Sequence, residues 1–227
     1  MASAVGRSRS PAGGGPAAFT AAATAALTVV LTVSACGAQA DNTLPITGMS
    51  EHNDDGMNGA VLADQYLMAD VTLTATDGSP YSLTRDTTGP LTLVFFGYTH
   101  CPDICAAVMS DIASAMTRLD ESDREQVAML FVTTDPARDD PQVLRQYLDR
   151  FDISFEGVTG DLGKIVEAGD ALGVEIERGA KLPSGGYSVA HGTQIVAIDE
   201  DDRAPIVWTE GTSADDLAED ITELLNT

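Results

Sequence analysis

Residues 91–96 are a short and nearly continuous apolar run, Leu-Thr-Leu-Val-Phe-Phe. A strand of this composition is typical of the interior of a sheet whose two faces are both covered. Pro102 follows, which suits a first helical turn, and apolar residues then recur every three to four positions from Ile104 to Leu119. The sequence therefore predicts a central strand that leads through a short loop into an amphipathic helix.

The remainder of the chain repeats this alternation of strands and helices. An antiparallel hairpin is expected around Asp77-Gly78, and the folded part is expected to begin near Met68. Strands that alternate with helices predict an α/β sandwich, with a central mixed sheet flanked by helices and an N-terminal β-hairpin. The other predicted strands are 127–132, 193–198 and 205–208, and the other predicted helices begin at 139–141, at 161 and after Ser213.

The N-terminus has the pattern of a signal peptide. Arg7 and Arg9 precede an uncharged apolar stretch over 17–33, and Val33-Ser34-Ala35-Cys36 resembles a bacterial lipobox. We expect residues 1–35 to be removed and Cys36 to carry lipid, which places the protein on the outer face of the cytoplasmic membrane. Ordinary secretion and an uncleaved anchor are the alternatives, although the apolar stretch is at the short end for spanning a bilayer.

The charge of the chain excludes one class of partner. The formal net charge is −23, and phosphate backbones are bound by Lys and Arg, so no nucleic-acid function is expected. Removal of residues 1–35 takes away Arg7 and Arg9 and no acidic residue, which leaves −25. This charge would reduce nonspecific binding to anionic lipid, or it would serve solubility or adaptation to salt.

Residues 36–65 are interpreted as a flexible tether because they lack apolar periodicity. The tether contains Met49, His52 and Met57, whose side chains suit copper. The alternative is a linker in which these residues are incidental.

Cys101 and Cys105 are the candidate reactive groups. They lie at the predicted start of a helix, where free backbone N–H groups and the helix dipole stabilise thiolates. Two thiolates at this spacing can hold one soft cation or exchange a disulfide. A purely structural disulfide is disfavoured, because it would close a loop of only about five residues and constrain the unfolded chain little.

A third ligand has to come from elsewhere in the chain. His191 lies just before a predicted buried strand, in a loop held by a rigid element, and is the best candidate. His100 adjoins Cys101 and is expected to be an exposed loop residue or a modulator of the thiolate. Two thiolates and one imidazole accept Cu(I), Cu(II) or zinc, so the donor set alone leaves the metal open.

Three segments in the correct order resemble the Sco/SenC family. Residues 95–105, Phe-Phe-Gly-Tyr-Thr-His-Cys-Pro-Asp-Ile-Cys, resemble the signature of these copper chaperones. Residues 134–139, Thr-Asp-Pro-Ala-Arg-Asp, and residues 187–191, which end in His191, resemble two further family segments. The resemblance extends over about 65–226.

The resemblance implies a thioredoxin-like domain over 66–227, tethered to the membrane, that helps to assemble the copper site of cytochrome c oxidase. Its partners would be the copper-bearing subunit of the oxidase, or another copper protein, and a thiol–disulfide reductant. Cys101, Cys105 and His191 would be the copper ligands. Asp135 would be a charge near the site, and Arg138 and Asp139 would be structural.

The sequence departs from the family at a few positions. Ala190 stands where the family usually has Asp directly before the histidine, which removes a carboxylate that could orient the ligand. Ala106 stands where a Pro often follows the second Cys, and this change should be tolerated.

Two functions follow from these residues. The first is a copper chaperone that binds Cu(I) or Cu(II) and passes it on by ligand exchange. The second is a thiol–disulfide oxidoreductase that reduces the cysteines of a copper-receiving partner, in which Cys101 attacks and Cys105 resolves. His191 discriminates between them, because an oxidoreductase has little need of it. A peroxidase is a weaker third reading, since a peroxidatic Cys needs no partner three residues on.

Overall fold

The computed structural model describes residues 56–226, apart from 88, 103 and 182–186. All of them belong to the second of two compact units, Leu44–Thr227. The predicted signal peptide, Cys36, Met49 and His52 lie outside the described residues and remain predictions. Within the described ranges, no helix combines the length and the apolar composition that a membrane crossing requires.

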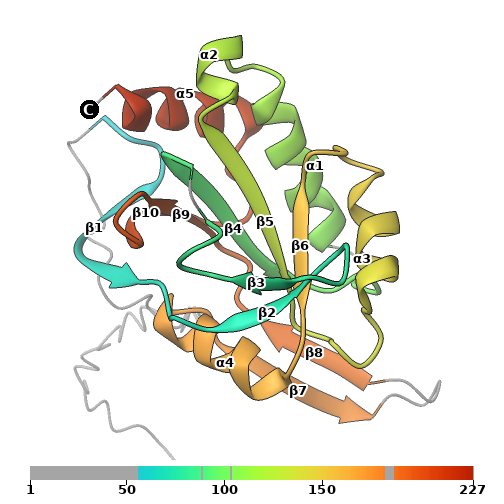
Figure 1. Cartoon of the computed structure of the whole chain (residues 1–227). Coiled ribbons are helices and arrows are strands. Elements are labelled where there is room, and N and C mark those ends of the chain that lie inside the picture. Colours follow the sequence, from blue (N-terminus) through green and yellow to red (C-terminus); the bar gives the residue numbers. More distant parts are fainter. Residues whose placement is uncertain (1–55, 88, 103, 182–186, 227) are drawn as a thin grey trace, which may run out of the picture. The chain divides into compact units, whose positions relative to one another are not determined.

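A mixed sheet of eight strands forms the centre of the domain (Figure 1). The strand order is β1-β10-β9-β4-β5-β6-β2-β3, in which β4, β5 and β6 are parallel and the other neighbouring pairs are antiparallel. The strands are β1 (Ala60–Leu67), β2 (Thr72–Ala75), β3 (Pro80–Ser82), β4 (Leu91–Gly97), β5 (Val127–Thr133), β6 (Glu156–Thr159), β9 (Ile195–Asp199) and β10 (Arg203–Trp208). A separate antiparallel ribbon contains β7 (Ile176–Lys181) and β8 (Tyr187–His191).

Helices cover both faces of the sheet, and this explains the apolar run at 91–96. Alternate residues of β4 enter two different core clusters: Leu93 and Phe95 pack with α1, α3 and α5, whereas Val94 and Phe96 pack with α4. Every residue of β4 is therefore buried. The helices are α1 (Ile104–Met116), α2 (Glu121–Arg124), α3 (Pro141–Leu148), α4 (Leu162–Ala171) and α5 (Ala214–Leu225).

The predicted fold class is confirmed, and the helix starts have local causes. The Asp140 side chain accepts a hydrogen bond from Val143 N at 2.8 Å at the start of α3. Asp161 and Ser213 cap α4 and α5 in the same way. A cap of this kind contributes about 1 kcal/mol, so these residues define where each helix begins.

The predicted boundary between tether and domain is wrong by several residues. The tether was expected to reach residue 65, but β1 begins at Ala60 and pairs with β10. Asn58 and Gly59 are also held, because the buried Asp220 carboxylate accepts hydrogen bonds from both of their backbone N–H groups. Strand β1 is hard to recognise in sequence, since its register with β10 shifts between Val61 and Tyr66 and its exposure does not alternate.

Candidate metal site

The loop that carries Cys101 leaves the carboxyl end of β4. Gly97, the last residue of β4, is a point of close approach: a Cβ atom there would lie 3.0 Å from the Phe131 ring. Cys101 N donates to Tyr98 O at 3.1 Å, which closes the turn. Cys105 then lies in the first turn of α1 and is fully buried, whereas Cys101 is partly exposed.

His191 comes from a different part of the chain and meets Cys105. Its Nε2 atom lies 3.6 Å from Cys105 Sγ, and its Nδ1 atom lies 2.8 Å from Gly192 O. A carbonyl oxygen only accepts, so the contact with Gly192 assigns the proton to Nδ1 and leaves the Nε2 lone pair directed at Cys105. His191 was expected in a loop, but it is the last residue of β8 and is paired with Ile176 of β7.

Aromatic rings surround the His191 imidazole. The Tyr98 ring meets it edge-on with a centroid separation of 5.7 Å, and the Phe95 ring does so at 6.3 Å. These rings limit the rotation of the imidazole and exclude water from one side of the site. Neither ring could be assigned to the site from sequence, because their contacts depend on how β4 and β8 are placed relative to each other.

Burial controls the protonation of both groups. Burial raises the pKa of the Cys105 thiol well above its ordinary value, and hydrogen bonding to Cys101 acts in the same direction. The expectation that the helix start would stabilise a thiolate is therefore wrong for Cys105 in the absence of a metal. Burial also lowers the pKa of His191, against the opposing effects of Gly192 and the Glu210 charge, so the imidazole is neutral and can act as a ligand.

The three predicted ligands are not equally close. Cys105 and His191 are in contact, and Cys101 adjoins Cys105 as a free thiol. Among the residues that the structure describes, no group of three His, Cys, Asp or Glu side chains is already arranged around a metal position. A three-ligand centre therefore requires the three side chains to adjust when a metal enters. The donor set of two sulfurs and one imidazole nitrogen itself fits copper.

The segment Thr134–Asp139 packs against the loop that carries Cys101. Arg138 forms an ion pair with the buried Asp135, and its guanidinium carbon lies 5.7 Å from the centroid of the Tyr98 ring. Asp135 is thus linked to His191 through Arg138 and Tyr98. The residue that contacts the cysteine loop directly is Asp139, which accepts from Thr99 N at 2.9 Å and from Thr99 Oγ1 at 2.6 Å.

Two further positions that the sequence had drawn attention to, His100 and Ala190, lie at the surface. His100 Nδ1 lies 3.0 Å from Thr99 Oγ1 and 3.7 Å from an Asp139 oxygen, and its side chain is largely exposed. Ala190 is exposed and is paired with Glu177 across the ribbon.

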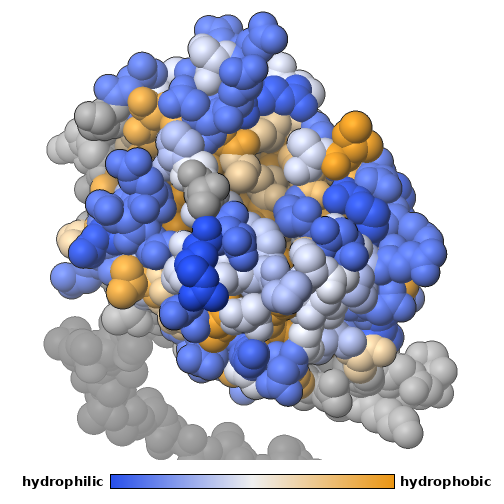
Figure 2. Space-filling view, viewed as in Figure 1, coloured by the Kyte–Doolittle hydropathy of each residue, from blue (hydrophilic) through white to orange (hydrophobic). Residues whose placement is uncertain are grey.

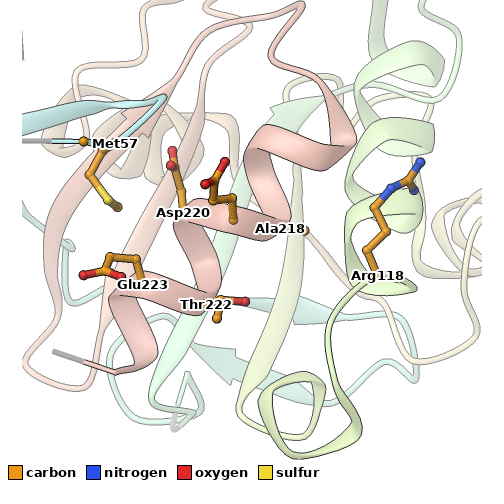
Figure 3. Close-up of a pocket in the computed structure, with 8 residues that line it drawn as sticks. Met57, Arg118, Ala218, Asp220, Thr222 and Glu223 are labelled. Atoms are coloured by element: carbon orange, nitrogen blue, oxygen red, sulfur yellow. The ribbon is translucent and has the colours of Figure 1, made fainter.

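A surface pocket of about 530 Å³ lies away from this site, beside α5 (Figure 3). It is lined by Met57, by Arg118 and by α5 residues that include Asp220 and Glu223, and it contains none of the predicted metal ligands. Met57 also packs against the core of the domain, which argues against its expected place in a flexible tether.

Comparisons with family models, with related sequences and with solved structures all point to the same family. The SCO1/SenC family model matches residues 60–226. A protein from Stutzerimonas stutzeri, whose name provisionally assigns it copper binding, is 31% identical over 160 residues, which cover 70% of this chain and 78% of the relative.

Two solved structures have the same fold. ScoI from Bradyrhizobium japonicum, solved with copper bound, is 28% identical with a TM-score of 0.63, over 70% of this chain and 99% of that one. Apo Sco1 from Thermus thermophilus is 27% identical with a TM-score of 0.67, over 77% of this chain and 99% of that one.

Proposed function

The chain belongs to the SCO1/SenC family, and on that premise we propose that it is a copper-binding protein which helps to assemble the copper site of cytochrome c oxidase. The proposed ligands are Cys101, Cys105 and His191. The observation that carries the proposal is the contact of 3.6 Å between Cys105 Sγ and His191 Nε2, two residues that are 86 positions apart in the sequence.

The chemistry of these ligands supports copper as cargo. Thiolates select soft Cu(I), and the imidazole nitrogen adds a ligand that also suits Cu(II). The hydrogen bond from Nδ1 to Gly192 O fixes the ring and its tautomer, which is how outer hydrogen bonds commonly orient a ligating histidine. Both thiols have to lose their protons when the metal enters.

The proposal includes a location and partners. Cys36 would carry lipid and hold the domain at the outer face of the cytoplasmic membrane, near the copper-bearing subunit of the oxidase or another copper protein. A thiol–disulfide reductant would keep Cys101 and Cys105 reduced. Labelling of the expressed protein with a radioactive fatty acid tests the anchor: the label should be lost in Cys36→Ser, and equal labelling of that variant would contradict it.

Copper titration of the reduced full-length protein tests the ligand set. We expect about one copper per chain and a thiolate-to-Cu(II) charge-transfer band. His191→Ala should weaken Cu(II) binding at least tenfold, whereas His100→Ala, which removes the exposed neighbouring imidazole, should leave the affinity within about twofold. Equal Cu(II) affinity in His191→Ala and the parent would contradict the three-ligand site. Tighter binding of zinc than of copper would assign the site to zinc instead.

The adjacency of the two free thiols favours thiol–disulfide exchange as the second candidate. In this reaction the Cys101 thiolate would attack the disulfide of a partner and form a mixed disulfide with it. Cys105 would then attack the Cys101 sulfur, which forms a Cys101–Cys105 disulfide and releases the partner with both of its thiols reduced, so that two electrons pass to the partner. His191→Ala separates the two functions, because it should impair copper binding and leave the rate of disulfide exchange nearly unchanged.

A further inference from the structure

We infer that Asp139 is a positioning residue which holds the Cys101 loop in place and, through its buried charge, favours Cu(II) over Cu(I) at the proposed site. This inference rests on the proposed copper binding. Asp139 is fully buried, and it lies four residues from Asp135, which the family resemblance implied as the charge near the site.

Three threonines at the ends of three parallel strands converge on this one residue. Thr99, two residues beyond β4, donates its N–H and its hydroxyl to the Asp139 carboxylate. Thr133, the last residue of β5, donates its hydroxyl to the same carboxylate at 2.7 Å. Thr159, the last residue of β6, donates to Asp139 O at 2.7 Å. Asp139 therefore fixes the cysteine loop at Thr99, two residues before Cys101.

The hydrogen bonds also indicate that Asp139 is charged. Its two carboxylate oxygens receive three donors, which matches an ionised carboxylate, since that form only accepts. Among the described residues, no Lys or Arg forms an ion pair with it, and its one ionisable partner is the exposed His100 at 3.7 Å. Asp135 differs in this respect, because Arg138 pairs with it.

The charge of Asp139 reaches the site. Its carboxylate contacts Thr99, two residues before Cys101, and both Asp139 and Cys105 are fully buried, so solvent and salt screen the charge little. Other ionisable groups that interact with Cys105 or His191 include Cys101, Tyr98, Tyr147 and the exposed Glu210.

The sign of the effect follows from a charge count. Two thiolates, a neutral imidazole and Cu(II) sum to zero, and one added electron gives a Cu(I) site with a charge of −1. A buried negative charge nearby repels the second state and leaves the first unaffected. Asp139 therefore lowers the reduction potential of bound copper, and removal of its charge should raise it.

The test compares Asp139→Asn with the parent as full-length, reduced protein under anaerobic conditions. Affinities for Cu(I) and Cu(II) are measured by competition with chelators, and the potential is measured at an electrode that supplies the electron. The ratio of Cu(II) to Cu(I) affinity should fall about tenfold in Asp139→Asn, which is a rise of about 59 mV for a one-electron couple. Should this variant fail to fold by circular dichroism, Asp139→Ser replaces it, because its hydroxyl is neutral, smaller and still an acceptor.

Two control variants separate charge from position. Thr99→Val removes one donor to Asp139 and no charge, so both affinities should fall and their ratio should stay within about twofold. Asp220→Asn neutralises another buried carboxylate, whose partners are Asn58, Gly59 and Trp208, and its ratio should equal that of the parent.

The outcomes distinguish this inference from the proposed function. A parent protein that binds no copper overturns both. A parent that binds copper, together with an unchanged ratio in Asp139→Asn, overturns the inference alone. So does a shift in Asp220→Asn as large as that in Asp139→Asn, because the effect would then not depend on where the charge lies.

Discussion

Cys105 is a buried thiol, and its proton has to leave before the sulfur can bind a metal ion. Burial raises its pKa, so the thiol stays protonated through the neutral range, and metal entry and proton loss are coupled. The neighbouring His191 has a lowered pKa and is already neutral at pH 7, so protons compete with copper for that ligand only in acid.

The copper affinity of the reduced protein should therefore rise with pH across about pH 6–9. The sign follows from the direction of the Cys105 shift: below its raised pKa each increase in pH lowers the cost of removing the thiol proton, by up to tenfold in affinity per unit and per proton released. Titrations in buffers of different ionisation enthalpy would count the protons. An affinity that does not change over this range would contradict a buried Cys105 ligand, and Cys105→Ser should flatten the dependence.

Single residues of the site differ in how far the sequence could predict them. Cys101, Cys105 and His191 were singled out because thiols and imidazoles are scarce in this chain and occur in recognisable segments. Tyr98, Phe95 and Asp139 were missed or given a merely structural role, because their part in the site depends on contacts between strand ends that are distant in sequence. A tally of residue types along the chain contains no information on such contacts.

At the scale of elements, long apolar patterns were predicted correctly and short, pattern-poor strands were not. Strand β4 is recognisable because burial on both faces gives a nearly continuous apolar run, and helix α1 because burial on one face gives an apolar residue every three to four positions. Strands β6 and β7 went unpredicted: β6 has four residues, and β7 forms a ribbon outside the main sheet. Tertiary pairing, which the local sequence does not encode, determines these strands.

Strand β1 is attached to the domain through a buried carboxylate of α5. Asp220 accepts from Asn58 N, Asn58 Nδ2 and Gly59 N, and from Trp208 Nε1 at 2.7 Å. Gly59 is required there, because a Cβ atom would lie 2.6 Å from Trp208 Nε1. One side chain thus joins the start of β1, the end of β10 and α5.

Asp220→Ala should lower the free energy of unfolding by about 3–5 kcal/mol, because it leaves several buried donors without a partner and each costs about 1–3 kcal/mol. Urea denaturation followed by circular dichroism measures the change. Asp215→Ala is the matched control: Asp215 lies on the same helix, but its side chain is 81% exposed in its ion pair with Arg118, so its loss should cost less than about 1 kcal/mol. Equal destabilisation by the two variants would contradict a special role for Asp220.

At the scale of the whole molecule, the acidic charge and the tether bear on how the domain meets its surroundings. Hydrophilic residues cover most of the face shown in Figure 2, and the full chain carries a net charge of −23. The compact domain extends further toward the N-terminus than its sequence indicates, since Asn58 and Gly59 are held by α5 and β1 pairs with β10. The part of the predicted tether before Gly56 lies outside the described residues, so its contribution has to be measured.

Two truncations separate the tether from the domain. A protein that starts at Gly56 keeps all the contacts described for Asn58, Gly59 and β1, and it should match the full chain in unfolding free energy and, if Met49 and His52 are incidental, in copper affinity. A protein that starts at Met68 loses the burial of Leu62, which is worth about 2 kcal/mol, removes the Asn58 and Gly59 donors to the buried Asp220 carboxylate, and leaves the edge of β10 unpaired. Its unfolding free energy should fall by about 5 kcal/mol or more. If the protein that starts at Met68 is as stable as the full chain, the boundary predicted at residue 65 stands. If the protein that starts at Gly56 binds copper more weakly than the full chain, Met49 or His52 is part of the copper site.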